Sequence, residues 1–163
     1  MPVTDVTTDL DNRTLTLIAE FAAPVERVWG IYADPRQLEQ VWGPEGYPAT
    51  FVDHALEPGG KVTYYMTSPE GDKYAGYWAV DTVDAPRRFT FRDGFALDAE
   101  TFAPNTDMPE SSVDYSFESI EGGTRAVYVT SYATAEALQQ VLDMGMVEGS
   151  KSAIGQIDAF LAA

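Results

Sequence analysis

The pattern of hydrophobic and polar positions predicts a chain made mostly of β-strands. In residues 61–67, Val62, Tyr64 and Met66 alternate with their neighbours, and this period of two is typical of a strand with one buried face. The same pattern predicts further strands over residues 13–21, 49–55, 74–83, 88–92, 112–120 and 124–132. The first residues, 1–12, are polar, and we expect them to be loosely ordered.

Two short helices are predicted between the first and second of these strands. Apolar residues recur at helical spacing over residues 25–32, and Pro24 suits the first turn because its missing N–H is not needed there. Asp34 and Pro35 end this helix and begin another near residues 36–41, with Asp34 as its N-cap.

A long helix is predicted at the end of the chain, with Thr134 as its cap. It carries one apolar stripe made of Leu138, Val141, Leu142, Gly145, Gly149, Ala153, Gln156, Ile157 and Phe160. Short connections between consecutive strands indicate an antiparallel sheet, and its apolar face needs the last helix as a cover. We therefore expect one α+β domain over residues 1–163, with about six to seven strands.

Composition and charge exclude several classes of function. The 163 residues include no cysteine, so disulfides and thiolate chemistry are absent. The net charge of −16 repels nucleic acid and anionic lipid surfaces, so we expect neither as a partner. No signal peptide and no membrane-spanning run are recognisable, which gives a cytoplasmic protein as the expectation. His54 is the only histidine, and no nucleotide-binding or metalloprotease motif occurs, so no metal or cofactor is expected.

Several short motifs occur along the chain in an order that is typical of one protein family. The segment 21–29 holds Ala-Pro and Val-Trp, and it is followed by Asp34-Pro35 and by Trp42-Gly43-Pro44. Together they resemble the START/Bet v 1-like superfamily, in the branch related to the C-terminal domain of the activator of Hsp90 ATPase. Further markers are Glu57-Pro58-Gly59-Gly60-Lys61, Gly76, Pro86-Arg87-Arg88, Gly122-Gly123-Thr124-Arg125 and Gly145-Met146 with Gly149.

This resemblance covers about residues 13–162 and implies a helix-grip fold. In that fold a curved antiparallel sheet wraps around the C-terminal helix. The resemblance also implies that function resides in a large internal pocket between the sheet and this helix, and not in a surface motif.

The inward faces of the predicted strands are rich in aromatic residues. Strand alternation predicts that eight side chains face the last helix. They are Tyr64, Met66, Trp78, Phe89, Phe91, Tyr115, Phe117 and Tyr128. One interpretation is ordinary core packing, and the other is a ligand cavity with aromatic walls and a few orienting hydroxyls. The tyrosines favour the cavity, because a buried phenol needs a hydrogen-bond partner that a dry core does not supply.

Glycine and methionine lie on the same helix stripe. Gly145 and Gly149 are each unfavourable in a helix interior by about 1 kcal/mol, so they need a reason. Either a large aromatic such as Trp78 packs closely against them, or their missing side chains leave room for a ligand, or the helix bends there. Met144 and Met146 flank this point, and methionine adapts to guests of different shapes as well as filling core gaps.

A few residues are candidates for the rim of the pocket. Trp42 precedes a Gly-Pro turn, and Tyr47 and Phe95 lie in expected loops that could gate an entrance. Glu148 lies beside the apolar stripe, where it could bind a polar group of a ligand or simply be a surface charge. The long segment 94–111 is an expected loop whose role as a lid stays open.

Three functions are compatible with these features. The leading hypothesis is a monomer or homodimer that binds a small hydrophobic or aromatic molecule in the internal cavity. The second, also implied by the resemblance, is an enzyme of the cyclase or dehydratase type acting on a polyketide-like substrate, with Tyr115, Tyr128, His54 or Glu148 supplying acid or base. The third, implied by the resemblance, is a protein-interaction module like a co-chaperone.

Overall fold

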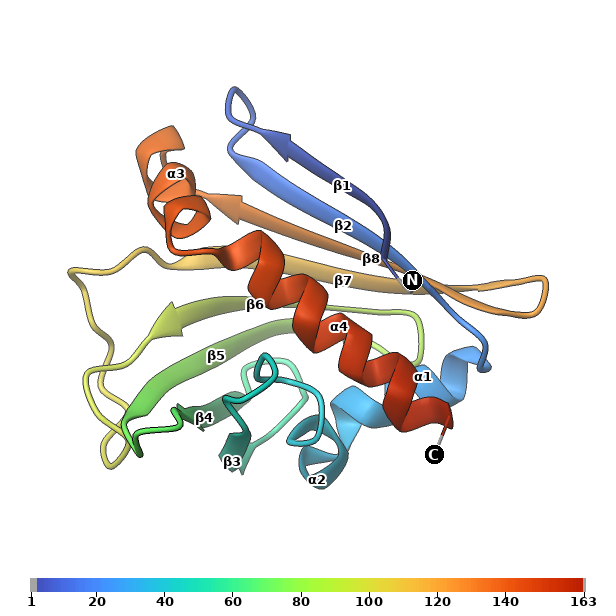
Figure 1. Ribbon diagram of the computed structural model, residues 1–163, viewed down its shortest axis with the longest axis horizontal. Helices are drawn as coiled ribbons and strands as arrows, with labels where there is room; N and C mark the ends of the chain where they lie inside the picture. The colour runs from blue at the N-terminus through green and yellow to red at the C-terminus, as the bar shows by residue number, and fades with distance from the viewer. Residues whose placement is uncertain (1–2, 163) are drawn as a thin grey trace.

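The computed structural model describes residues 3–162 and shows a single sheet covered by helices (Figure 1). In chain order the elements are β1 (Val3–Asp9), β2 (Thr14–Phe21), α1 (Val25–Ala33), α2 (Pro35–Leu38), β3 (Ala49–His54), β4 (Lys61–Thr67), β5 (Lys73–Asp84), β6 (Arg88–Phe95), β7 (Ser111–Ile120), β8 (Gly123–Tyr132), α3 (Ala135–Asp143) and α4 (Met146–Ala162).

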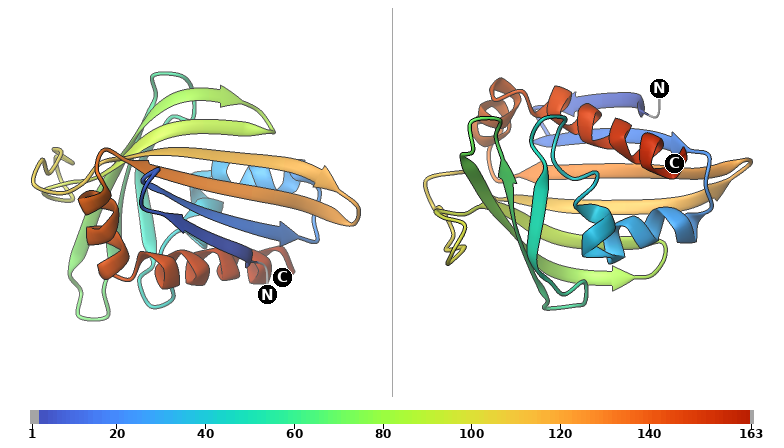
Figure 2. Two further views of the ribbon diagram at one scale, coloured as in Figure 1. Left: turned by 90° about the horizontal axis from the view of Figure 1, so that it is seen from above. Right: turned by 60° about the horizontal axis from the view of Figure 1, so that its bottom comes forward.

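The sheet has the order β1-β2-β8-β7-β6-β5-β4-β3, and all neighbouring strands are antiparallel. It curves around α4, which crosses its inner face, as Figure 2 shows. The helix-grip architecture and the antiparallel pairing are confirmed. Residues 3–162 contain eight strands, which is slightly more than the six to seven predicted.

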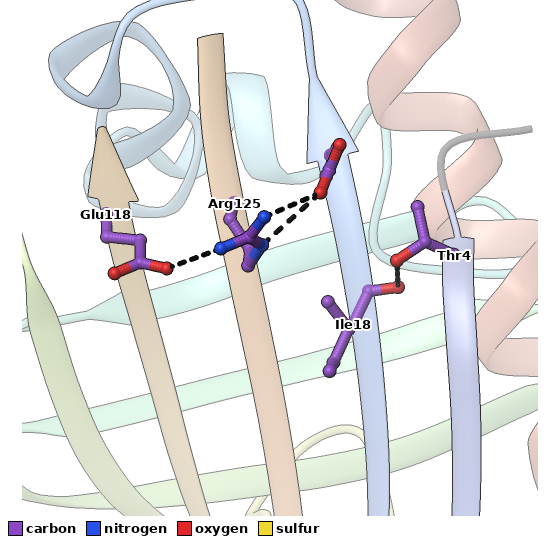
Figure 3. Close-up of polar contacts among 5 residues, drawn as sticks. Thr4, Ile18, Glu118 and Arg125 are labelled. Atoms are coloured by element: carbon purple, nitrogen blue, oxygen red, sulfur yellow. Dashed lines mark hydrogen bonds and ion pairs between the residues drawn. The ribbon is translucent and has the colours of Figure 1, made fainter. Parts of the chain in front are cut away.

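The additional strand is β1, and here the prediction of a loosely ordered residue range 1–12 was wrong. Residues 1 and 2 lie outside the described residues, but Val3–Asp9 pairs with β2 along its length. The Thr4 hydroxyl also donates to the Ile18 carbonyl at 3.3 Å (Figure 3). An edge strand with one exposed face can be mostly polar, so hydrophobicity alone did not reveal it.

The alternation predicted for the other strands is confirmed by their burial. In β2, every second residue from Leu15 to Phe21 is buried on the face that holds the core. Helix α1 packs on the same face, where Trp29 meets Phe89 edge-on at 5.5 Å between ring centroids. Aromatic contacts of this kind stabilise by about 0.5–1.5 kcal/mol beyond the area they bury.

Both predicted helix caps are present. The Asp34 carboxylate accepts from the backbone N–H of Arg36 at 2.9 Å, and the Thr134 hydroxyl accepts from that of Ala137 at 3.0 Å. The single long helix predicted after Thr134 is instead two helices. Met144 and Gly145 separate α3 from α4, and Gly145 has φ +86°, a left-handed conformation that glycine adopts without strain.

An ion-pair network crosses three strands on the outer face of the sheet. Arg125 of β8 lies 3.0 Å from a carboxylate oxygen of Glu118 in β7 (Figure 3). It also lies 3.1 Å from a carboxylate oxygen of Glu20 in β2. These charges are partly exposed, so each pair contributes at most about 1 kcal/mol. The polar outer face leaves the inner face to hold the apolar core and the site.

Candidate functional site

A cavity of about 530 Å³ lies between the inner face of the sheet and α4. The strands contribute four tyrosines to its wall, which are Tyr64 of β4, Tyr115 of β7, and Tyr128 and Tyr132 of β8. Helix α4 contributes an apolar wall that includes Gly149 and Ile157. Its volume falls within the roughly 300–1,000 Å³ typical of pockets for small molecules.

The structure brings together eight of the twelve residues that the sequence indicated for a binding site. The residues that line the cavity are Trp42, Tyr64, Met66, Tyr115, Tyr128, Met144, Gly145 and Gly149. They come from the segment after α2, from three strands, from the junction of α3 with α4 and from α4 itself. Elements far apart in the sequence therefore converge on one space.

Three of the remaining candidates form a second aromatic layer behind the wall. Trp78 is fully buried, stacks on Phe91 at 4.3 Å between centroids and meets Trp42 at 5.0 Å. Phe117 lies against Tyr32 at 5.5 Å. For these three residues the core-packing interpretation applies, because each is enclosed by other rings and does not line the cavity.

Two polar candidates also lie away from the cavity wall. The Glu148 side chain is 83% exposed and lies 3.9 Å from the Lys151 ammonium on the outside of α4. His54, at the end of β3, has its Nε2 2.9 Å from the Tyr32 carbonyl oxygen, which fixes the ring in a structural contact. Neither can serve as an acid or base for a guest in this cavity.

The glycines of the apolar stripe mark open space. A Cβ atom built at Gly149 would meet no atom within 4 Å, and the same is true at Gly145. The alternative of close packing against Trp78 is therefore wrong, since Trp78 is not near either position. A bend occurs at Gly145, while at Gly149 the absent side chain enlarges the cavity.

The tyrosines of the wall form a buried hydrogen-bonded group. The hydroxyls of Tyr32 and Tyr128 are 2.9 Å apart, and the ring of Tyr115 meets that of Tyr128 edge-on at 4.6 Å. Burial is the main reason that the pKa values of all three phenols are raised, so they are neutral at physiological pH. They present hydroxyl donors and acceptors to the cavity without charge.

Asp93 is a cavity residue that the sequence analysis missed. Strand β6 continues past residue 92 to Phe95, which turns Asp93 toward the cavity, where its Oδ1 accepts from the Tyr64 hydroxyl at 3.1 Å. Burial raises the pKa of this carboxyl to about 7, with the negative charge of Glu110 adding to the effect, while the bond from Tyr64 opposes it. Strand alternation extended by one more step from Phe91 would have found it.

The Trp42-Gly43-Pro44 motif is attached to α4 beside the cavity. Gln156 donates to the Gly43 carbonyl, and the Ser152 hydroxyl accepts from the backbone N–H of Glu45 at 3.0 Å. A Cβ at Gly43 would lie 1.8 Å from the Tyr47 carbonyl oxygen, so only glycine fits this turn. These contacts hold Trp42 against the cavity.

The cavity opens to solvent near the junction of α3 with α4. Met144 and Tyr47 line it and are also exposed, at 56% and 37% respectively. Phe95 lies on the same wall, at the end of β6 and not in a loop as expected. These residues form the exposed rim of the cavity.

Residues 3–162 contain neither a metal-binding cluster nor a membrane-spanning helix. No cluster of three or more His, Asp or Glu side chains in this range could hold a metal ion. No helix in it is long and apolar enough to span a membrane.

Comparison with known families identifies the relationship. The model of the family described as activator of Hsp90 ATPase homolog 1-like protein matches residues 22–162. The chain belongs to this family. Among curated proteins, comparison gave no significant match.

Solved structures agree with this assignment. Protein Ms6760 from Mycobacterium smegmatis is 66% identical with a TM-score of 0.90, and the match covers 98% of this chain and 97% of that one. A protein from Arthrobacter aurescens is 42% identical with a TM-score of 0.92, over 98% and 92% of the two chains. The AHSA1 protein from Silicibacter pomeroyi is 25% identical with a TM-score of 0.74, over 91% and 97%.

Proposed function

We propose that this protein binds a small molecule with a hydrophobic or aromatic body in the cavity between the sheet and α4. The observation that carries this proposal is the open space of about 530 Å³ bordered by tyrosines and by Gly149. Apolar burial supplies affinity at roughly 25 cal/mol per Å² removed from water, and the hydroxyls orient the guest.

The test is a thermal-shift screen with aromatic and lipid-like compounds, followed by titration of the hits. A ligand that binds only the folded protein must raise its melting temperature. Gly149→Leu should abolish the shift, because its side chain enters the cavity, whereas Gly155→Leu changes the same helix outside the cavity wall and should leave it intact. Equal shifts in both variants, or no shift with any compound, would contradict the proposal.

A second candidate function is an enzyme that moves a proton on a substrate in the same cavity. Asp93 favours it, because a carboxyl with a pKa near 7 beside the Tyr64 hydroxyl is suited to act as an acid or base. Conversion of a bound compound that disappears in Asp93→Asn while binding persists would establish catalysis.

We also propose that the protein acts in the cytoplasm, as a monomer or homodimer. A chain without cysteine suits a reducing compartment. Fractionation of cells and analytical ultracentrifugation of the purified protein test the two points separately.

A further inference from the structure

Asp93 places a carboxyl group in the wall of the cavity, and the proposed function assigns it no role in binding. One of its oxygens accepts from Tyr64, and neither oxygen is paired with a Lys or Arg side chain in the described part of the chain. The neighbouring Arg92 side chain instead lies 4.0 Å from Asp81 and 3.9 Å from Glu110. The cavity therefore contains an acidic group without a cationic partner.

The rest of the wall offers no competing cation. Among the described residues that line the cavity, Asp93 is the single carboxylate, and Lys, Arg and His are absent. Tyr64 donates a hydrogen bond to Asp93. Burial raises the pKa of the Tyr115 and Tyr132 phenols, and both lie close enough to Asp93 that its charge adds to this effect. Trp42 adds an indole 5.6 Å from the ring of Tyr64.

A carboxylate among aromatic faces is a combination that recognises organic cations. The carboxylate supplies a charge-assisted hydrogen bond, and ring faces within about 6 Å attract a cation through their quadrupoles. The net charge of −16 on the whole protein attracts cations to its surface and disfavours anionic guests.

We propose that the ligand is an amphiphilic amine, whose apolar body fills the cavity and whose ammonium group binds Asp93. This inference rests on the proposed function, since it names the chemical class of the same guest. The ammonium donates to the carboxylate of Asp93, and the rings of Tyr64 and Trp42 flank it. The body lies along α4 over Gly149.

The test compares three probes that share a naphthalene body and differ in the head group. They are 2-(1-naphthyl)ethylamine, 2-(1-naphthyl)ethanol and 1-naphthylacetate, titrated calorimetrically into the full chain at pH 8. We expect the amine to bind at least about tenfold more tightly than the alcohol, and the acetate to bind most weakly. Asp93→Asn should remove the preference for the amine and leave the alcohol within about twofold, whereas Asp107→Asn, an exposed control, should change neither.

The outcomes separate the inference from the proposed function. If the alcohol or the acetate binds as tightly as the amine, or if Asp93→Asn keeps the preference, the amine assignment is overturned and the apolar cavity stands. If none of the three binds, the amine assignment is overturned, and the proposed function falls with it unless the thermal-shift screen yields a ligand.

A measurement on the wild-type protein tests the inference even if the Asp93→Asn variant does not fold. At pH 7 the arriving ammonium should displace a proton from Asp93, so the binding heat of the amine should depend on the ionisation heat of the buffer. The titratable groups close to Asp93 are Tyr64, Tyr77, Tyr115, Tyr132 and Glu110, and the phenols stay neutral at this pH. A binding heat that is identical in phosphate and Tris would overturn the inference.

Discussion

Strand geometry holds Asp93 on the inner face of β6. Its burial lowers the free energy of unfolding by an amount that depends on pH. Burial raises its pKa to about 7 from an ordinary value near 3.8. Between these two values the folded protein keeps a proton that the unfolded chain has lost. The free energy of unfolding therefore falls as pH rises through this window, and the group contributes most to stability below it.

Asp93→Asn removes this dependence. We expect the variant to gain stability relative to the wild type on going from pH 5 to pH 8, by an amount on the order of a few kcal/mol at most. Urea unfolding at both pH values measures it, with Asp107→Asn as the exposed control. Parallel behaviour of the wild type and Asp93→Asn across this range would show that the carboxyl is not perturbed.

Gly43 is needed for its size, because a Cβ there would lie 1.8 Å from the Tyr47 carbonyl oxygen. We expect Gly43→Ala to destabilise the fold by about 1–3 kcal/mol, since the turn must shift to relieve the contact. Gly30→Ala is the matched control, because it lies in α1 with open space around it and should stabilise by up to about 1 kcal/mol. Denaturant unfolding of both variants measures the change in the free energy of unfolding, which should have opposite signs. A Gly43→Ala variant as stable as the wild type would contradict the prediction.

The inward tyrosines were predictable, but Asp93 was not found. Tyr64, Tyr115 and Tyr128 follow the alternation of strongly patterned strands, so their face was fixed by period two. Asp93 stands between a charged residue and a glycine, a composition typical of a turn, and pairing with β5 and β7 overrides that preference.

At the scale of elements, the junction of α3 and α4 decides the direction of α4 over the sheet. Gly145 adopts φ +86° there. We expect Gly145→Ala to cost about 1–2 kcal/mol because a Cβ is strained in this region, and Gly145→Asn to cost less. Gly155→Ala, inside α4 with open space around it, should instead stabilise by up to about 1 kcal/mol. Thermal unfolding measures the stability of all three variants. Equal effects of alanine at both glycines would contradict the claim that the left-handed conformation at Gly145 requires glycine.

The sequence predicted one helix after Thr134 because its apolar stripe continues through the break. Helical periodicity survives a single left-handed residue when both helices rest on the same sheet. The strand β1 was missed for a related reason. Its pattern is mostly polar, and it is held by hydrogen bonds to β2 together with partial burial of Val3 and Val6.

At the scale of the whole molecule, the acidic surface is a source of self-repulsion. There are 26 Asp and Glu residues against 10 Lys and Arg. We expect the melting temperature to rise when NaCl is increased from about 0.01 M to about 0.15 M, because the Debye length falls from about 30 Å to about 8 Å. Calorimetry measures this, and a fall in melting temperature would mean that ion pairs such as Arg125 with Glu20 outweigh the repulsion.

The overall fold was predictable because many weak patterns and motifs agree on it. The volume of the cavity between the sheet and α4 was not predictable. It depends on the packing of Trp78 and Phe91 in the second aromatic layer and on the space left by the missing side chain of Gly149. Such distances arise only when the sheet curvature and the path of α4 are known.

The most direct test of a ligand-binding cavity is a two-dimensional amide NMR titration with the best compound from the screen. Binding in the cavity predicts saturable shifts that are largest at Gly149, Ala153, Tyr115 and Tyr128, on opposite walls of one space. Shifts confined to the outer face, around Arg125 and Asp114, or no saturable shift at all, would contradict the account.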